Sequence, residues 1–189
     1  TPSVFSAQSI DKILTAVRML LPLEPYAEVT LEANPGTFEV QKFKDFRSAG
    51  VNRLSIGIQS FNPHHLKALG RVHDDREALC AVEMAQSHFD NINLDVMYAL
   101  PEQTVQQAQA DIETACSFGV SHLSVYHLTL EPNTLFYRFP PQLPDDETAA
   151  TMQGMIEQTL MSRGYRHYET SAYAQPGKES QHNTNYWLF

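Results

Sequence analysis

The sequence has little cysteine, no basic cluster and no long apolar run, and each of these shortages excludes a class of protein. Its two cysteines, Cys80 and Cys116, lie far apart in helix-like segments, so neither a disulfide framework nor a C-x-x-C pair is present. We expect both to be ordinary buried residues in a reducing cytosol. The longest apolar run, around residues 19–21, is far too short to span a membrane.

The charge balance argues against nucleic acid as a partner. The formal net charge is −9, from 13 Lys and Arg against 22 Asp and Glu, and no basic patch is visible. A length of 189 residues with 42% hydrophobic residues fits one sizeable soluble domain. The segment that begins at Thr1 lacks the charged region and apolar core of a secretory signal, so a cytoplasmic location is expected.

Common catalytic motifs are missing as well. No G-x-S-x-G elbow, Walker loop or H-E-x-x-H helix occurs, so acyl transfer, nucleotide hydrolysis and zinc proteolysis have no support. His64, His65 and His73 could suggest a metal site. They lie among helix starts and polar loop residues, however, and we expect them to be solvated surface side chains.

Helical and strand patterns alternate along the chain, which predicts an α/β fold with a parallel sheet and outer helices. Helices are predicted at residues 10–21, 37–50, 63–69, 74–88, 104–118 and 146–163, and strands at 28–33, 53–59, 92–97, 122–128 and 165–169. An open doubly wound sheet and a (β/α) barrel both fit this order. The barrel is favoured because no Gly-rich phosphate loop follows any strand. Since the chain opens on a helix, a further strand is expected before Thr1.

Polar residues occur toward the C-terminal ends of the predicted strands. They are Glu32, Gln59, Asp95, His127 and Glu169. Strands buried on both faces should be continuously apolar, and an unpaired buried carboxylate is costly. Because the carboxyl ends of barrel strands carry the active site, we expect these residues to meet in one pocket for a polar ligand. The alternative is that each merely caps a neighbouring loop. Arg71 and Arg53 could add positive charge, although a structural salt bridge is the expected role of Arg53.

A second candidate site is the polar segment after Gly177, which we expect to be extended. Its residues 182–187 (HNTNYW) include the only Trp of the sequence. A His and two aromatic side chains could flank a planar macrocycle, with His182 as an axial iron ligand. Composition alone favours a loop whose aromatic side chains pack back onto the domain.

Several longer segments resemble the oxygen-independent coproporphyrinogen oxidase group of the radical S-adenosylmethionine (radical SAM) proteins. The matching segments are residues 32–37 (EANPGT), 50–62 (GVNRLSIGIQSFN), 69–71 (LGR), 93–101 (NLDVMYALP) and 122–126 (HLSVY). Residues 129–134 (TLEPNT), 168–174 (YETSAYA) and the HNTNYW segment are similar to the HemW branch, whose haem chaperones carry an H-N-x-x-Y-W haem-binding motif. The resemblance implies an incomplete TIM-like barrel over residues 1–175, with residues 176–189 starting a C-terminal region.

The resemblance also implies ligands for particular residues. Binding of SAM is implied for Thr1, Glu32, Gln59, Arg71, Asp95 and Thr129, and binding of haem for His182, Asn183, Tyr186 and Trp187. His182 is then the expected ligand of the haem iron. The expected partners are haem and a haem-accepting protein, through which the chaperone could associate peripherally with a membrane.

The chain departs from the family pattern in several places. The C-x-x-x-C-x-x-C loop, whose thiolates hold a [4Fe–4S] cluster in the family, is absent and is expected before Thr1. The domain that follows the H-N-x-x-Y-W motif is absent too, so the sequence is expected to be a fragment. Ala99 and Glu102 replace residues that are usually Gly or small and polar. The alternative function within this group is radical decarboxylation of coproporphyrinogen III.

Overall fold

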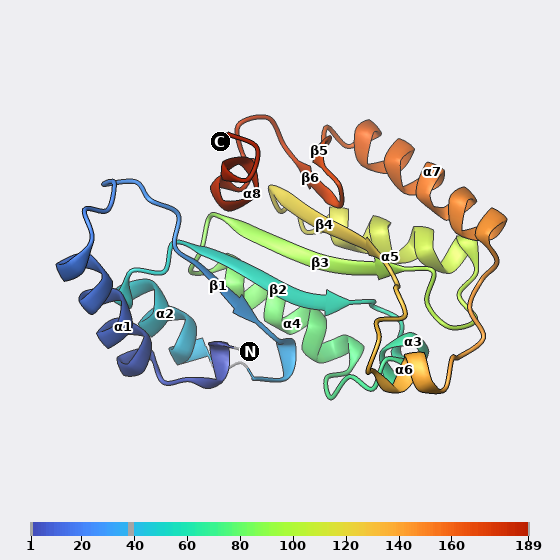
Figure 1. The fold of residues 1–189 in the computed structure, drawn as a ribbon, viewed down its shortest axis with the longest axis horizontal. Coiled ribbons are helices and arrows are strands. Elements are labelled where there is room, and N and C mark those ends of the chain that lie inside the picture. Colours follow the sequence, from blue (N-terminus) through green and yellow to red (C-terminus); the bar gives the residue numbers. More distant parts are fainter. Residues whose placement is uncertain (1, 38–39, 189) are drawn as a thin grey trace.

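The computed structural model describes residues 2–37 and 40–188. The SAM contact expected for Thr1 therefore lies outside the described residues. Within them, six strands form one sheet, and helices alternate with the strands along the chain (Figure 1).

The elements follow the predicted order. The strands are β1 (Thr30–Ala33), β2 (Arg53–Gln59), β3 (Ile92–Tyr98), β4 (His122–His127), β5 (Arg166–Glu169) and β6 (Ala172–Ala174). The α-helices are α1 (Ala7–Leu20), α2 (Val40–Ala49), α3 (Pro63–Ala68), α4 (Asp75–Gln86), α5 (Val105–Ser117), α6 (Leu135–Arg138), α7 (Asp146–Ser162) and α8 (Gln181–Asn185), and the 3₁₀ helices are η1 (Pro2–Val4) and η2 (Pro35–Thr37). Every predicted helix and strand has a counterpart, whereas β6, α6 and α8 correspond to no predicted element.

The sheet topology confirms the barrel type. The strand order is β1-β2-β3-β4-β6-β5, so β1 to β4 lie side by side in chain order, and all three of their pairings are parallel. A doubly wound sheet would reverse its order and carry helices on both faces. Here α4, α5 and α7 lie on one side and leave the other side open (Figure 1). β6 runs antiparallel to both β4 and β5, which the expectation of a parallel sheet missed.

The helix-covered face of the sheet forms the hydrophobic core. The strands contribute Leu31, Leu54, Ile56, Ile58, Ile92, Leu94, Val96, Leu123 and Val125, and the helices contribute residues that include Phe43, Phe46, Val82, Ile112, Met152 and Ile156. Along each strand the core residues are two positions apart, because successive side chains point to opposite faces. The intervening residues therefore point to the open face.

Local sequence signals fix several helix ends. Asp74 with Glu77 and Thr104 with Gln107 form capping boxes at the starts of α4 and α5, each satisfying two orphan backbone N–H groups. Gly119, with φ +65°, follows the C-cap residue Phe118 of α5 in the left-handed conformation that glycine favours at helix ends. Among the described residues, no helix combines the length and apolar character needed to cross a membrane.

Two expectations about exposure are wrong. Cys116 is buried as expected, but Cys80 is exposed, because the side of α4 that carries Ala81 and Val82 faces the core. His65 and His73 are 0% and 3% exposed rather than solvated. The Nε2 atom of His73 donates a hydrogen bond of 2.9 Å to the carbonyl of Ile58. This bond holds the loop after α3 against the end of β2.

Two neighbouring residues of α7 test the assignment of its core face. Leu160 is 0% exposed and Met161 is 75% exposed. We expect Leu160→Ala to lower the free energy of unfolding by about 2–5 kcal/mol, because it leaves a cavity in the core. Met161→Ala should change it by less than about 0.5 kcal/mol. Chemical denaturation of the full-length variants measures both values, and equal losses would contradict the assigned orientation of α7.

Candidate binding site

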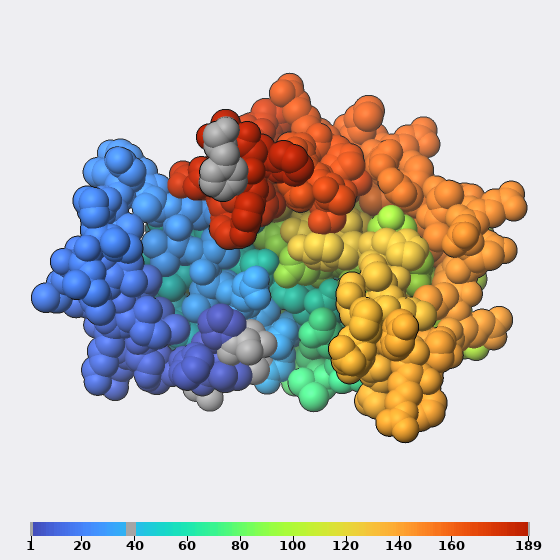
Figure 2. Space-filling model, viewed as in Figure 1, coloured from blue at the N-terminus to red at the C-terminus, as the bar shows by residue number. Residues whose placement is uncertain are grey.

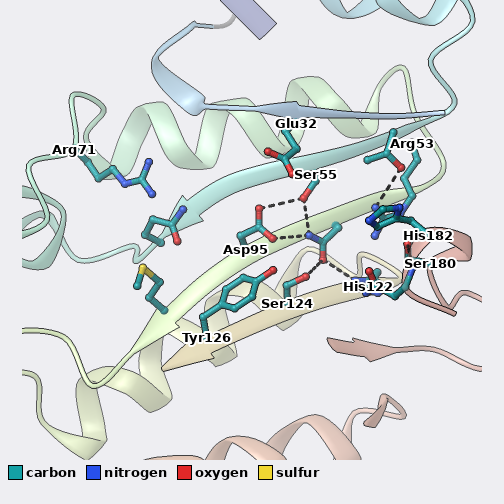
Figure 3. Close-up of a pocket in the computed structure, with 15 residues that line it drawn as sticks. Glu32, Arg53, Ser55, Arg71, Asp95, His122, Ser124, Tyr126, Ser180 and His182 are labelled. Atoms are coloured by element: carbon teal, nitrogen blue, oxygen red, sulfur yellow. Dashed lines mark hydrogen bonds between the residues drawn. The ribbon is translucent and has the colours of Figure 1, made fainter. Parts of the chain in front are cut away.

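The open face of the sheet carries a polar pocket of about 510 Å³ (Figure 3). The strand residues that line it are Thr30 and Glu32 from β1, Arg53, Ser55 and Gln59 from β2, Asn93, Asp95 and Met97 from β3, and His122, Ser124 and Tyr126 from β4. Arg71 and three residues around α8 complete the wall. Figure 2 shows this face hollowed along its centre, with α8 at one border of the hollow.

The strand positions explain which predicted residues meet. Glu32, Gln59 and Asp95 line one pocket, as predicted, together with Arg71. His127 and Glu169 do not line it, so the predicted convergence is wrong for these two.

The two misses have different reasons: the direction of the side chain for His127 and the position of the strand for Glu169. On β4 the residues His122, Ser124 and Tyr126 face the pocket, so the next residue, His127, points the other way. β6 separates Glu169 from β4. The pocket also extends along the whole face rather than only the C-terminal rim, because Asp95 is the middle residue of β3.

Asp95 lies at the floor of the pocket and is held by two neighbours. Its carboxylate accepts hydrogen bonds from Asn93 Nδ2 at 2.7 Å and from Ser55 Oγ at 3.1 Å. Burial raises the pKa of Asp95 to about 6, and these hydrogen bonds limit the rise. Burial also lowers the pKa of Arg71, while the attraction of Asp95 partly offsets this effect. The pocket thus holds a partly buried carboxyl group and a partly buried guanidinium.

Asn93 connects Asp95 to the next strand. Its side-chain oxygen accepts hydrogen bonds from Ser124 Oγ at 3.0 Å and from His122 Nδ1 at 2.6 Å. Since an amide oxygen only accepts, the proton of the His122 ring must reside on Nδ1. Burial, and then the positive charge of Arg53, lower the pKa of His122 to about 3, so the ring is neutral at pH 7.

A neutral His122 has an unprotonated Nε2, and that atom faces β5. Nε2 lies 2.6 Å from the hydroxyl of Tyr168, which must therefore be the donor. The Tyr168 oxygen in turn accepts hydrogen bonds from the backbone N–H of Ser180 at 3.1 Å and from Asn183 Nδ2 at 3.0 Å. The polar network of the sheet thus reaches α8.

The start of α8 is also held by Glu28, which precedes β1. The Glu28 carboxylate accepts hydrogen bonds from Ser180 Oγ at 3.0 Å and from the backbone N–H groups of Gln181 and His182 at 3.2 and 3.5 Å. Arg53 Nε lies 3.8 Å from the same carboxylate in a buried ion pair, which confirms the structural salt bridge expected for Arg53. The segment after Gly177 is therefore not extended but ends in a short helix with fixed N-terminal contacts.

The residues implied in haem binding divide between the pocket wall and the outer surface. His182 and Asn183 line the pocket, whereas Tyr186 and Trp187 lie outside it and are 62% and 71% exposed. The ring of Tyr186 meets that of His182 edge to face, with centroids 5.0 Å apart. The aromatic side chains thus do not pack back onto the domain. Thr129 is exposed and does not line the pocket either; its hydroxyl donates to the His127 carbonyl at 3.4 Å.

The sequence that forms this pocket matches a known protein family. The family model of the radical SAM superfamily matches residues 6–115. The chain belongs to the radical SAM superfamily. Membership implies SAM and a [4Fe–4S] cluster as cofactors of the complete protein.

Individual radical SAM relatives narrow the comparison. The chain is 48% identical to the haem chaperone HemW of Escherichia coli and 47% identical to that of Haemophilus influenzae, over its whole length and 50% of theirs. It is 38% identical to the mitochondrial radical S-adenosyl methionine domain-containing protein 1 of Danio rerio. The chain thus spans about half the length of the curated relatives it matches.

A solved radical SAM structure has the same fold. The coproporphyrinogen III oxidase HemN of Escherichia coli matches 95% of this chain and 42% of its own, with a TM-score of 0.85 and 23% sequence identity. At this identity the match identifies the shared architecture alone. It agrees with the one-sided helices and consecutive strand order of the partial barrel.

Gln59 of the radical SAM barrel adopts a conformation that is rare for a non-glycine residue. Its φ is +67°, in the left-handed region. The residues after it are fixed by the buried Asp111 of α5, which accepts hydrogen bonds from Ser60 Oγ at 2.6 Å and from the N–H of Phe61 at 2.8 Å. A Cβ atom at Gly57 would lie 3.0 Å from Gln59 Nε2, so the absence of a side chain there leaves room for the amide. These contacts hold the end of β2 in its strained turn.

Sequence reasoning missed several residues of the polar network. They are Ser55, Asn93, His122, Ser124 and Tyr168. The signal for the first four is the period of two within the strands: polar residues at 53, 55 and 59, at 93 and 95, and at 122 and 124 alternate with apolar ones. Tyr168 carries no such signal, because its role depends on how β5 lies in the sheet.

The neutral His122 predicts a specific pH dependence of stability. An unfolded histidine binds a proton below about pH 6.5, whereas folded His122 does so only near pH 3. The contribution of His122 to the free energy of unfolding is therefore fully present above about pH 6.5 and is lost as the pH falls toward 3. We expect the advantage of the natural protein over His122→Gln to shrink by roughly 2–3 kcal/mol between pH 7 and 4.5.

Denaturation of both full-length proteins across this pH range measures the difference. The raised pKa values of Asp95 and Asp111, both about 6, act in the opposite sense, since the folded protein binds these protons first. They are present in both proteins and largely cancel in the comparison. Parallel pH profiles would show that His122 is not neutral in the folded state.

Proposed function

We propose that this chain is the SAM- and haem-binding part of a haem chaperone of the HemW type, which delivers haem to an acceptor protein. The observation that carries the proposal is the shared pocket. Glu32, Gln59, Arg71 and Asp95 line the same cavity as His182 and Asn183. The similarity to haem chaperones over the full length of the chain supports it.

The pocket chemistry fits SAM. The ligand carries a sulfonium, an ammonium and a carboxylate together with ribose hydroxyls. Glu32 and Asp95 suit the positive groups or the hydroxyls, Arg71 suits the carboxylate, and the Gln59 amide offers both donors and an acceptor. SAM would supply the reactive sulfonium of radical SAM chemistry, while these side chains bind and orient it.

The cysteines described here do not fit the cluster. A [4Fe–4S] site of this family needs three clustered thiolates, whereas Cys80 is exposed on α4 and Cys116 is buried on α5. The described residues also contain no group of three or more His, Cys, Asp or Glu side chains suited to a metal ion. No chemical step is therefore assigned to a cluster held by these residues.

The surface around α8 fits haem. His182 is exposed and its imidazole would bind the haem iron, and Tyr186 and Trp187 present large aromatic surfaces to solvent nearby. A planar macrocycle that covered these side chains would remove apolar area from water. Haem bound at such an open position can leave again without unfolding the domain, which suits transfer to an acceptor protein.

The haem assignment is tested by titrating haem into full-length protein and following the Soret band. We expect His182→Ala to weaken binding at least roughly tenfold, about 1.4 kcal/mol, because the iron loses its protein ligand. His64→Ala is the matched control, since His64 is exposed on α3 and does not line the pocket. Unchanged affinity of His182→Ala, or anaerobic conversion of coproporphyrinogen III by the reconstituted protein, would contradict the proposed function.

The SAM assignment is tested by calorimetric titration of SAM into the full-length protein. We expect Arg71→Met to weaken binding roughly ten- to hundredfold, since a charge-assisted hydrogen bond contributes about 1.5–3 kcal/mol. Arg76→Met serves as the control, because Arg76 is exposed on α4 and does not line the pocket. Equal affinities of the two variants would remove Arg71 from the SAM site.

A further inference from the structure

The helix that carries His182 has little apolar packing to hold it. α8 contains five residues, none of them buried. A helix this short is not stable by itself in water, because nucleation costs more than so few hydrogen bonds return. Its position must therefore depend on contacts with the rest of the domain.

Two polar side chains make those contacts. Glu28 accepts hydrogen bonds from Ser180 Oγ and from two backbone N–H groups at the start of α8. The hydroxyl of Tyr168 accepts hydrogen bonds from the Ser180 N–H and from the side chain of Asn183. Together they contact Ser180, Gln181, His182 and Asn183, which includes the residue on either side of His182.

Both anchors are themselves fixed from the sheet. Glu28 is paired with the buried Arg53 at the start of β2. Tyr168 donates to His122 Nε2, His122 donates to Asn93, and Asn93 donates to Asp95. The donor and the acceptor of each of these hydrogen bonds are determined, so the protons of the network have a single arrangement. Through Tyr168 the network joins the first turn of α8 to the floor of the pocket. Figure 3 shows its inner part, between His122 and Asp95.

We propose that Tyr168 and Glu28 are positioning residues, which hold α8 against the sheet so that the His182 imidazole lies at the wall of the pocket. The proposal rests on the haem role of His182 proposed above. Neither anchor lies within the H-N-x-x-Y-W segment, and Glu28 is separated from Gln181 by 153 positions. Tyr168 is the more informative of the two, because a single hydroxyl group makes its contacts to α8 and to His122.

Tyr168→Phe removes that hydroxyl and leaves the ring. The Ser180 N–H, the Asn183 amide and His122 Nε2 then lose a partner in a part-buried setting, which favours release of α8. We expect haem affinity of the full-length variant to fall roughly tenfold, with a Soret band and electron paramagnetic resonance spectrum that shift toward those of His182→Ala. Added imidazole should restore the spectrum of the natural protein, because it replaces a displaced ligand.

Tyr165→Phe is the matched control. Tyr165 is buried, and its hydroxyl donates to the Val120 carbonyl rather than to the network that reaches α8. This variant loses a buried hydroxyl and some stability but should keep the haem affinity and spectrum of the natural protein. SAM affinity of Tyr168→Phe should stay within about threefold, since Arg71 is untouched and Asp95 keeps its direct hydrogen bonds from Asn93 and Ser55.

The outcomes separate this proposal from the function on which it rests. If His182→Ala loses haem while Tyr168→Phe keeps both natural affinity and natural spectrum, the positioning role is wrong and the haem site stands. If His182→Ala binds haem normally, the proposed function fails first. Should Tyr168→Phe not fold, Glu28→Gln decides in its place: unchanged haem affinity and spectrum overturn the proposal, and a weaker, imidazole-rescued complex supports it.

Discussion

Alternation of side chains along parallel strands is the constraint on which this structure depends. Along β1 to β4, apolar residues at alternate positions pack against the helices, while most of the residues between them line the polar pocket. A shift of one residue in any strand would exchange the two faces. The same alternation that builds the core thus gathers acids, amides, hydroxyls and an imidazole on the open face.

A polar surface of this kind is stable only if its members satisfy one another. Asp95 is partly buried, and it is supported by Asn93 and Ser55 rather than by an opposing charge in direct contact. Asn93 is shared in turn by Ser124 and by a neutral His122. With the groups around it fixed, the pocket presents Asp95 and Arg71 to a ligand in defined positions, and little reorganisation is needed on binding.

α8 combines an anchored backbone with exposed aromatic side chains. Its first residues are bound to Glu28 and Tyr168, whereas Tyr186 and Trp187 extend into solvent beyond them. This division suits a site for a large planar ligand that must be both held and released. The anchoring residues come from distant parts of the chain, so the helix can be in place only when the sheet is assembled.

The sequence by itself determined the alternation of helices and strands, the barrel type and the presence of both candidate segments, because these follow from local periodicity, capping and motif. Only the tertiary structure decided which polar residues meet. In the sequence, His127 and Asp95 are equally plausible members of the pocket. Because side chains alternate along a strand, Asp95 points into the pocket and His127 points away from it. The backbone of Ala99 and Glu102 was also decided by the tertiary structure. Their φ values of +56° and +57° lie in the region that glycine favours, and neither residue type indicates such a conformation. The contact between Tyr168 and α8 likewise depends on β6 entering the sheet between β4 and β5, a long-range pairing that no local pattern encodes.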